Sequence, residues 1–221
     1  MISLKKGVLS MNTVITIGRQ FGSGGREIGE KLAAHFDIPY YDKELINRVA
    51  KDSGFCQEII ESNDERPTSS FLYNLVMDTY SFGYNSSSYI DMPISHKIFL
   101  AQFDTIKKIA DEGPCVIVGR CADYALSERN NVLNLFISAN EECRIGRIKE
   151  RHPDITSDSK ARDMMNKKDK QRQSYYNYYA SGKWGHASTY DMTINSSVLG
   201  LDGTAELIAK YVEEFDRKSQ Q

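Results

Sequence analysis

Five short apolar runs, separated by segments with helical spacing, constrain the fold of this chain most strongly. Each run is four or five residues long and rich in β-branched or aromatic side chains: VITI (14–17), IPYY (38–41), CVIV (115–118), NLFIS (134–138) and MTIN (192–195). Several are apolar without interruption, as in strands that are covered on both faces. Strands that alternate with helices are typical of a parallel sheet. The sequence therefore predicts an α/β protein with a five-stranded parallel sheet flanked by helices.

Two segments interrupt this alternation. Residues 52–97 form a polar insertion, which we expect to be helical, and residues 154–189 hold a charged, tyrosine-rich helix and the only tryptophan. Neither has the apolar content of a separate core. We therefore expect one domain over residues 1–221, with its core in 12–51, 98–153 and 190–217.

Composition excludes several classes of protein. The net charge is -2, whereas a non-specific nucleic-acid binder usually carries a basic excess. No apolar run approaches the roughly 18 residues that span a membrane, and we expect a cytoplasmic location. The four cysteines form no CxxC pair, and no histidine lies at zinc-site spacing from them. We expect reduced thiols, mostly in the core, and no structural metal.

The first predicted strand runs into a glycine-rich turn, VITIGRQFGSGGREIG. Glycines let backbone N–H groups turn around an anion, and the helix that follows adds its positive end. We expect an anion site at Gly22, Ser23, Gly24, Gly25, Arg26 and Glu27. The alternatives are a tight turn that binds nothing and a dinucleotide-binding loop, although the third glycine of that fingerprint is missing.

Polar side chains follow the other predicted strands, and ligands of parallel sheets bind beyond the carboxyl ends of strands. Arg120 follows CVIVG, where it can hold a phosphate through two parallel N–H bonds, or form an ion pair with Asp123 or with a helix carboxylate. Asp42 can accept a hydrogen bond from a ribose or a base, or cap the next helix. Arg48, on that helix, contacts the ligand or faces solvent.

The helix that is predicted to follow the fourth strand and that strand's own helix carries clustered positive charge, including Lys168 and Arg172. It is either a solvated helix or a lid that brings cations over transferring phosphates. Four tyrosines follow, at 175, 176, 178 and 179. Tyrosines at this spacing either stack on a base or anchor the helix to the body of the protein.

Taken together, these stretches resemble the cytidylate-kinase-like proteins of the P-loop nucleoside-monophosphate kinase superfamily. The resemblance rests on ITIGRQFGSGGREIGEKLA, YYDKELINRV, VIVGRCADY, LFISANEECRIGRI, KKDKQRQSYYNYY and YDMTINSS. It implies a three-layer P-loop kinase fold, with an acceptor-binding insertion (52–97) and a lid (154–189). It also implies transfer of the γ-phosphoryl group of ATP, with Mg²⁺, to a nucleoside monophosphate such as CMP.

The resemblance also implies roles for individual residues. Gly22 to Glu27 would hold the ATP phosphates, and Asp42, Arg48 and Arg120 would bind the acceptor. Arg26, Lys168 and Arg172 would be catalytic, because the charge of Arg26 can cover the β- and γ-phosphates and the other two close over the transferring group.

The sequence also departs from the family pattern. Gly25 stands where a P-loop has its lysine, with Arg26 one step later, and no serine or threonine follows to ligate Mg²⁺. Ser23 is the one hydroxyl in the loop that could contact the metal. Cys121 replaces the aspartate of the Gly-Arg-Asp motif.

These departures leave two rival functions open: a non-catalytic nucleotide-binding protein on a kinase scaffold, and a kinase of another small phosphoacceptor. Apolar residues of the insertion, Phe71, Leu72, Tyr73, Leu75 and Val76, are compatible with a homodimer.

Overall fold

A five-stranded parallel sheet forms the centre of the computed structural model, which describes residues 11–65 and 92–219. The strands are β1 (Val14–Arg19), β2 (Tyr40–Tyr41), β3 (Val116–Val118), β4 (Val132–Ser138) and β5 (Met192–Asn195), in the order β2-β3-β1-β4-β5. Every neighbouring pair is parallel. All five predicted strands and the predicted fold class are therefore confirmed.

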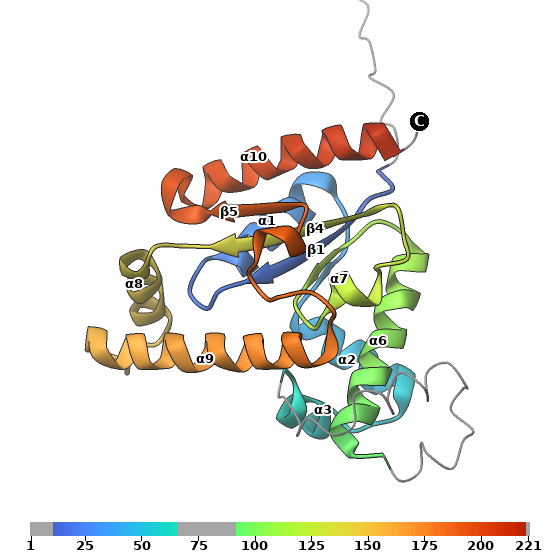
Figure 1. The fold of residues 1–221 in the computed structure, drawn as a ribbon, viewed down its shortest axis with the longest axis horizontal. Helices are drawn as coiled ribbons and strands as arrows, with labels where there is room; N and C mark the ends of the chain where they lie inside the picture. Colours follow the sequence, from blue (N-terminus) through green and yellow to red (C-terminus); the bar gives the residue numbers. More distant parts are fainter. Residues whose placement is uncertain (1–10, 66–91, 220–221) are drawn as a thin grey trace, which may run out of the picture.

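Helices cover both faces of the sheet because its strands are apolar on both. On one face, α1 (Gly25–Phe36) and α10 (Ser196–Ser219) pack against β1, β3 and β4 through Ile28, Leu32, Ile208 and Val212, all fully buried. On the other, α2 (Lys43–Ser53), α6 (Ile94–Glu112) and the short α7 (Ala122–Ala125) enclose a second apolar cluster. Figure 1 shows α10 on one side of the sheet and α9 on the other.

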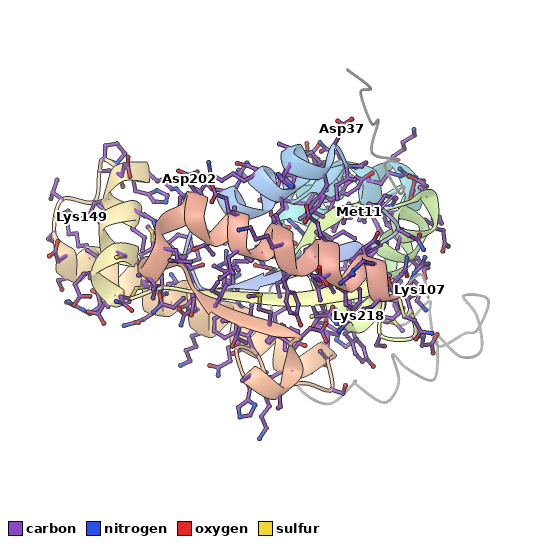
Figure 2. The ribbon with its side chains drawn as sticks, turned by 90° about the horizontal axis from the view of Figure 1, so that it is seen from above. Met11, Asp37, Lys107, Lys149, Asp202 and Lys218 are labelled. Atoms are coloured by element: carbon purple, nitrogen blue, oxygen red, sulfur yellow. The ribbon has the colours of Figure 1, made fainter. Side chains whose placement is uncertain are left out.

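The carboxyl ends of the strands meet at one end of the molecule. In Figure 1 the arrowheads of β1 and β4 point toward α8 (Glu141–Arg151). Figure 2 shows Lys149 of α8 at that end and Lys107 of α6 at the opposite end. Because β1 lies between β3 and β4, the loops that follow these three strands are neighbours.

The charged, tyrosine-rich segment forms the long helix α9 (Asp158–Tyr179). Tyr175, Tyr176 and Tyr179 are buried, and the ring of Tyr179 stacks on Phe99 of α6 with centroids 3.9 Å apart. These tyrosines anchor the helix, so the structure favours anchoring over stacking on a base. The opposite half of α9 carries exposed lysines beside the glycine loop.

Several smaller expectations turn out differently. Cys115 and Cys121 are buried free thiols, but Cys56 and Cys143 are exposed. Leu207 and Tyr211, two large apolar side chains of the C-terminal helix α10, are about two-fifths exposed, at 42% and 40%. Within the insertion the structure describes α3 (Gln57–Asn63), and the apolar residues 71–76 lie outside the described residues. No helix of the described chain is long and apolar enough to cross a membrane.

Candidate active site

The glycine loop makes a tight turn between β1 and α1. Gly22 and Gly24 have φ angles of 77° and 81°, a region that L-residues with side chains rarely adopt. A Cβ atom at Gly24 would also lie 2.2 Å from Cδ2 of Leu201. The helix α1 begins at Gly25, so its free N–H groups face the loop. This is the backbone geometry that binds anions at a helix N-terminus.

Residues from α8 and α9 hold the loop from outside. The Phe21 N–H donates to Oδ1 of Asp169 at 2.7 Å, and Nε of Arg144 donates to the Phe21 carbonyl at 2.8 Å. Arg144 and Asp169 also pair with each other. Arg147 adds a bond from Nη1 to the Gly22 carbonyl at 3.2 Å. The α9 helix is thus already fastened to the loop in this conformation.

A cleft of about 620 Å³ opens beside the loop, at the carboxyl ends of the strands. Eight cationic residues line it: Arg19, Arg26, Lys43, Arg120, Arg147, Arg151, Lys168 and Arg172. Four anionic residues also line it: Asp42, Glu61, Asp64 and Glu65. The cleft is therefore cationic although the whole chain carries a net charge of -2. Such an excess inside a concave site attracts polyanions.

Two neighbouring strands end in the same dipeptide, Gly-Arg. Arg19 ends β1 and Arg120 follows β3, and the two guanidinium groups share the carboxylate of Asp42 at 4.0 and 3.5 Å. Their side chains are only 12% and 3% exposed. The backbone at Gly119, Arg120 and Cys121 has positive φ at all three positions. Strain of this kind persists where surrounding contacts hold a side chain in place, here the buried Arg120.

Two carboxylates at the end of α3 bind these arginines. Asp64 accepts from Nε and Nη2 of Arg120, each at 2.9 Å. Glu65 lies between two arginines, 2.8 Å from Nη1 of Arg19 and 3.3 Å from Nε of Arg172. Although burial opposes ionisation, the charges of Arg19, Arg172 and Arg120 hold the pKa of Glu65 well below its usual range.

The surroundings of the site shift the pKa values of Arg172 and Arg120 in opposite directions. Burial, reinforced by the charge of Arg19, lowers the pKa of Arg172 to about 10. Burial also opposes the charged form of Arg120, but Asp64 and Glu65 outweigh it and raise the pKa of Arg120. Arg120 and Arg172 are therefore both cationic at neutral pH, and an incoming anion meets a fixed positive charge.

The structure decides between the alternatives for Asp42 and Arg120. Asp42 stands at the N-cap position of α2, but its side chain makes no capping bond and instead lies beside Arg120. Arg120 is ion-paired, as one alternative predicted, but the partners are Asp64 and Asp42. Asp123 accepts a hydrogen bond from the hydroxyl of Tyr176, so the predicted pairing of Arg120 with Asp123 is wrong.

The three residues predicted to be catalytic all line the cleft. Arg26 is 46% exposed and contacts Glu30 at 3.0 Å and Asp42 at 3.6 Å, so its guanidinium group faces the Asp42 side. Lys168 is exposed on α9. Arg172 donates to the Arg19 carbonyl at 3.3 Å, directly beside the loop.

Ser23, Glu27 and Arg48 are the predicted site residues that do not line the cleft, and Arg48 reaches α6 instead. Its guanidinium group pairs with Glu112 of α6 and lies 3.4 Å from Asp52. Arg48 lies on α2, six residues after Asp42, and from that position its side chain reaches α6. An acceptor-binding role for Arg48 is therefore not supported by its position.

The residues that could hold Mg²⁺ fit a metal poorly. The Ser23 hydroxyl is fully buried and has no hydrogen-bond partner among the described residues, but Ser23 does not line the cleft. Glu27 is occupied by Arg151 of α8. Within residues 11–65 and 92–219, no three acidic, histidine or cysteine side chains group as a metal site does. The described chain thus offers no cage of its own for Mg²⁺.

Arg19, Asp64, Glu65, Arg144 and Arg147 belong to the site but were not predicted from the sequence. Arg19 carried a usable signal, because it follows a glycine at a strand end just as Arg120 does. Asp64 and Glu65 carried none, since they lie in a polar stretch and reach the cleft only through the packing of α3.

Comparisons with known proteins identify the family and the fold of this chain. A model of the cytidylate kinase-like family matches residues 14–198. An uncharacterized protein from Eubacterium ventriosum ATCC 27560 is 32% identical, with a TM-score of 0.67, over 91% of this chain and 98% of that one. Shikimate kinase from Bacteroides thetaiotaomicron is 10% identical, with a TM-score of 0.50 and the same coverage, and shows the fold alone. No curated protein matches.

Proposed function

This chain belongs to the cytidylate kinase-like family, and from that premise we propose that it transfers the γ-phosphoryl group of ATP to a nucleoside monophosphate, with CMP as the first acceptor to test. Membership in the family supports a phosphotransferase role with nucleotide substrates. The acceptor, the cofactor and the roles of single residues are our proposals.

One observation carries the proposal. A single cationic cleft is lined by the glycine loop, by Arg19 at the end of β1 beside that loop, and by Arg120 after β3. Phosphoryl transfer asks for positioning and for positive charge around an in-line displacement, with little covalent chemistry from the protein. A protein that only binds one nucleotide has no need of cations both at the loop and after β3.

We assign the donor side to Gly22, Ser23, Gly24 and Gly25, whose backbone N–H groups would hold the phosphates of ATP. Lys168 and Arg172 on α9 would cover the transferring group and exclude water. In this proposal α9 acts as the lid within residues 154–189. The bonds from Phe21 to Asp169 and Arg144 would keep that lid close to the loop.

We assign the acceptor side to Asp42 and Arg120. A guanidinium group that presents two parallel N–H bonds suits a phosphate, and Asp64 already uses both bonds of this kind on Arg120. The acceptor phosphate would replace Asp64 there. Asp42 would accept a hydrogen bond from the sugar or the base of the acceptor.

Mg²⁺ would enter with ATP, held by the phosphates and by water, because such ions usually need few protein ligands in kinases. Bound in this way it would neutralise charge that develops on the phosphoryl oxygens.

The charge on the acceptor side favours a second candidate function. Two carboxylates, those of Asp42 and Asp64, pair with Arg120 on that side, and they would oppose the binding of a dianionic acceptor. A small, uncharged acceptor with several hydroxyl groups meets no such repulsion. A kinase of such a compound is therefore the alternative to a nucleoside-monophosphate kinase.

A single assay separates these functions. The protein is incubated with Mg-ATP and, in separate reactions, with CMP, other nucleoside monophosphates and a panel of polyhydroxyl compounds, and ADP is measured. ADP formed fastest with CMP supports the proposal. ADP formed only with an uncharged hydroxyl acceptor supports the alternative. Thermal shift with ATP but no ADP with any acceptor would identify a non-catalytic nucleotide-binding protein.

A further inference from the structure

The space where a P-loop lysine would begin is already filled. A Cβ atom at Gly25 would lie 2.7 Å from Cβ and 3.2 Å from Cγ of Arg19. These are atoms at the base of the arginine side chain, which cannot swing aside as a flexible end can. A lysine at position 25 and an arginine at position 19 therefore exclude each other in this backbone.

A second glycine leaves room for the guanidinium end of Arg19. A Cβ atom at Gly119 would lie 2.0 Å from Nη1 of Arg19, so the guanidinium group occupies the space that a side chain at position 119 would need. The side chain of Arg19 is 12% exposed and lines the cleft. Gly25 at the start of α1 and Gly119 after β3 thus leave room for one arginine.

The two positions are also related in the sequence. The P-loop pattern GxxxxGK[ST] has its first glycine six residues before its lysine. If Gly24 is the second glycine of that pattern, its first glycine falls on position 19 and its lysine on position 25. This chain has Arg at 19 and Gly at 25. The cation and the glycine have exchanged places across the loop.

We propose that Arg19 is the residue that binds the ATP phosphates in place of the missing lysine, and that Glu65 occupies this anion position until ATP arrives. The inference rests on the proposed function for the identity of the ligand. Arg19 and Arg172 reach the Glu65 carboxylate from two sides, at 2.8 and 3.3 Å. A carboxylate clamped between two guanidinium groups marks a place where phosphoryl oxygens can bind.

Arg26 is less well placed for this task. It is 46% exposed, and its contacts go to Glu30 and Asp42. The charge of an exposed cation is screened by water. Arg19 is instead enclosed by the loop, the strand end that carries Gly119 and the lid helix.

Binding of Mg-ATP and of inorganic tripolyphosphate, measured by titration calorimetry without an acceptor, tests the proposal. Arg19→Ala should weaken both by about tenfold or more, as expected for the loss of a charge-assisted contact. Glu65→Gln should bind both ligands more tightly than the unmodified protein. Circular dichroism and thermal melts check that each variant is folded.

An exchange of residues makes the test independent of simple damage. Gly25→Lys alone should bind poorly, because the lysine meets Arg19, and Arg19→Gly alone should also bind poorly. The double variant R19G/G25K removes the clash and restores a cation, so it should regain binding. A double variant no better than R19G would overturn the proposal, as would a larger loss in Arg26→Ala than in Arg19→Ala.

The remaining outcomes separate this inference from the proposed function. Arg19-dependent binding without ADP formation would leave the inference standing and contradict the kinase proposal. ADP formation by the unmodified protein, together with unchanged ATP affinity in Arg19→Ala, would support the kinase proposal and overturn the inference about Arg19. Unchanged or weaker affinity in Glu65→Gln would overturn the role given to Glu65.

Discussion

Both carboxylate oxygens of Asp64 lie 2.9 Å from the guanidinium nitrogens Nε and Nη2 of Arg120. This is the geometry in which an arginine binds a phosphate, and here the ligand is a residue of the same chain. Arg120 is 3% exposed, and Asp64 is 20% exposed. The acidic partner is therefore the more accessible and the easier of the two to displace.

Arg120→Ala should raise the KM for the acceptor and leave the KM for ATP nearly unchanged. It should also destabilise the fold by about 1–3 kcal/mol, because Asp64 and Asp42 lose a charged partner. Steady-state kinetics with each substrate varied, together with urea denaturation, measures both effects. If only stability falls, Arg120 serves a structural ion pair and not the acceptor.

Arg48→Ala should leave the acceptor KM unchanged. Its partners are Asp52 and Glu112, outside the cleft, and a surface ion pair contributes about 1 kcal/mol or less. The same kinetic assay serves as the measurement, with Arg120→Ala alongside. A rise in acceptor KM as large as that of Arg120→Ala would restore Arg48 to the site.

Gly119→Ala should lower activity, because the added Cβ would lie 2.0 Å from Nη1 of Arg19 and 2.6 Å from Oε1 of Glu65 and would displace both side-chain ends. Gly54→Ala is the matched control, with a similar φ of 76° but nothing within 4 Å of the added atom. Each substitution pays about 1–2 kcal/mol for a left-handed alanine. Equal losses of activity in Gly119→Ala and Gly54→Ala would show that the positions of Arg19 and Glu65 beside Gly119 have no part in activity.

Asp169→Ala should raise the KM for ATP several-fold, because Asp169 is the acceptor for the Phe21 N–H and the partner of Arg144. Without it α9 loses its bond to the glycine loop. Asp163→Ala, on an exposed position of the same helix, is the control. Identical KM values in the two variants would show that the contact with the loop has no part in nucleotide binding.

His96 should make stability depend on pH. Burial lowers the pKa of His96 below the ordinary value of 6.5, and Nε2 lies 3.2 Å from the hydroxyl of Tyr178. Between the lowered folded value and about 6.5, the unfolded chain binds a proton that the folded chain does not. Stability should therefore fall as the pH drops below 6.5, by at most about 1.4 kcal/mol per pH unit.

Chemical denaturation at pH 7.5, 6.5 and 5.5 measures this dependence on pH. His96→Gln removes the titrating group and keeps a polar side chain, so its stability should change less over this range. An equal pH dependence in the variant would assign the effect to other groups.

Periodicity alone was enough to predict the sheet and its helices. Short β-branched runs and apolar residues at helical spacing reflect local backbone preference and burial, and both are written in neighbouring residues. The glycine loop and Arg120 were likewise found from their places at strand ends, because all parallel strands present their carboxyl ends to the same edge.

Local patterns could not predict which charged side chains meet. Arg48 follows Asp42 by six residues, yet α2 carries it to Glu112 while Asp42 stays at the cleft. Asp64 and Glu65 meet arginines that lie 46 to 107 positions away in the chain. Such pairings depend on how helices pack across the sheet, and nothing within a window of neighbouring residues records them.

The sequence by itself determined an α/β fold with a glycine loop at the end of its first strand. Only the tertiary structure decided which arginine fills the place of the absent lysine. A lysine on α1 and an arginine at the end of β1 would compete for one volume, and the close approach of Arg19 to Gly25 shows which residue occupies it. Packing between elements settles a question of that kind, because two side chains cannot share the same space.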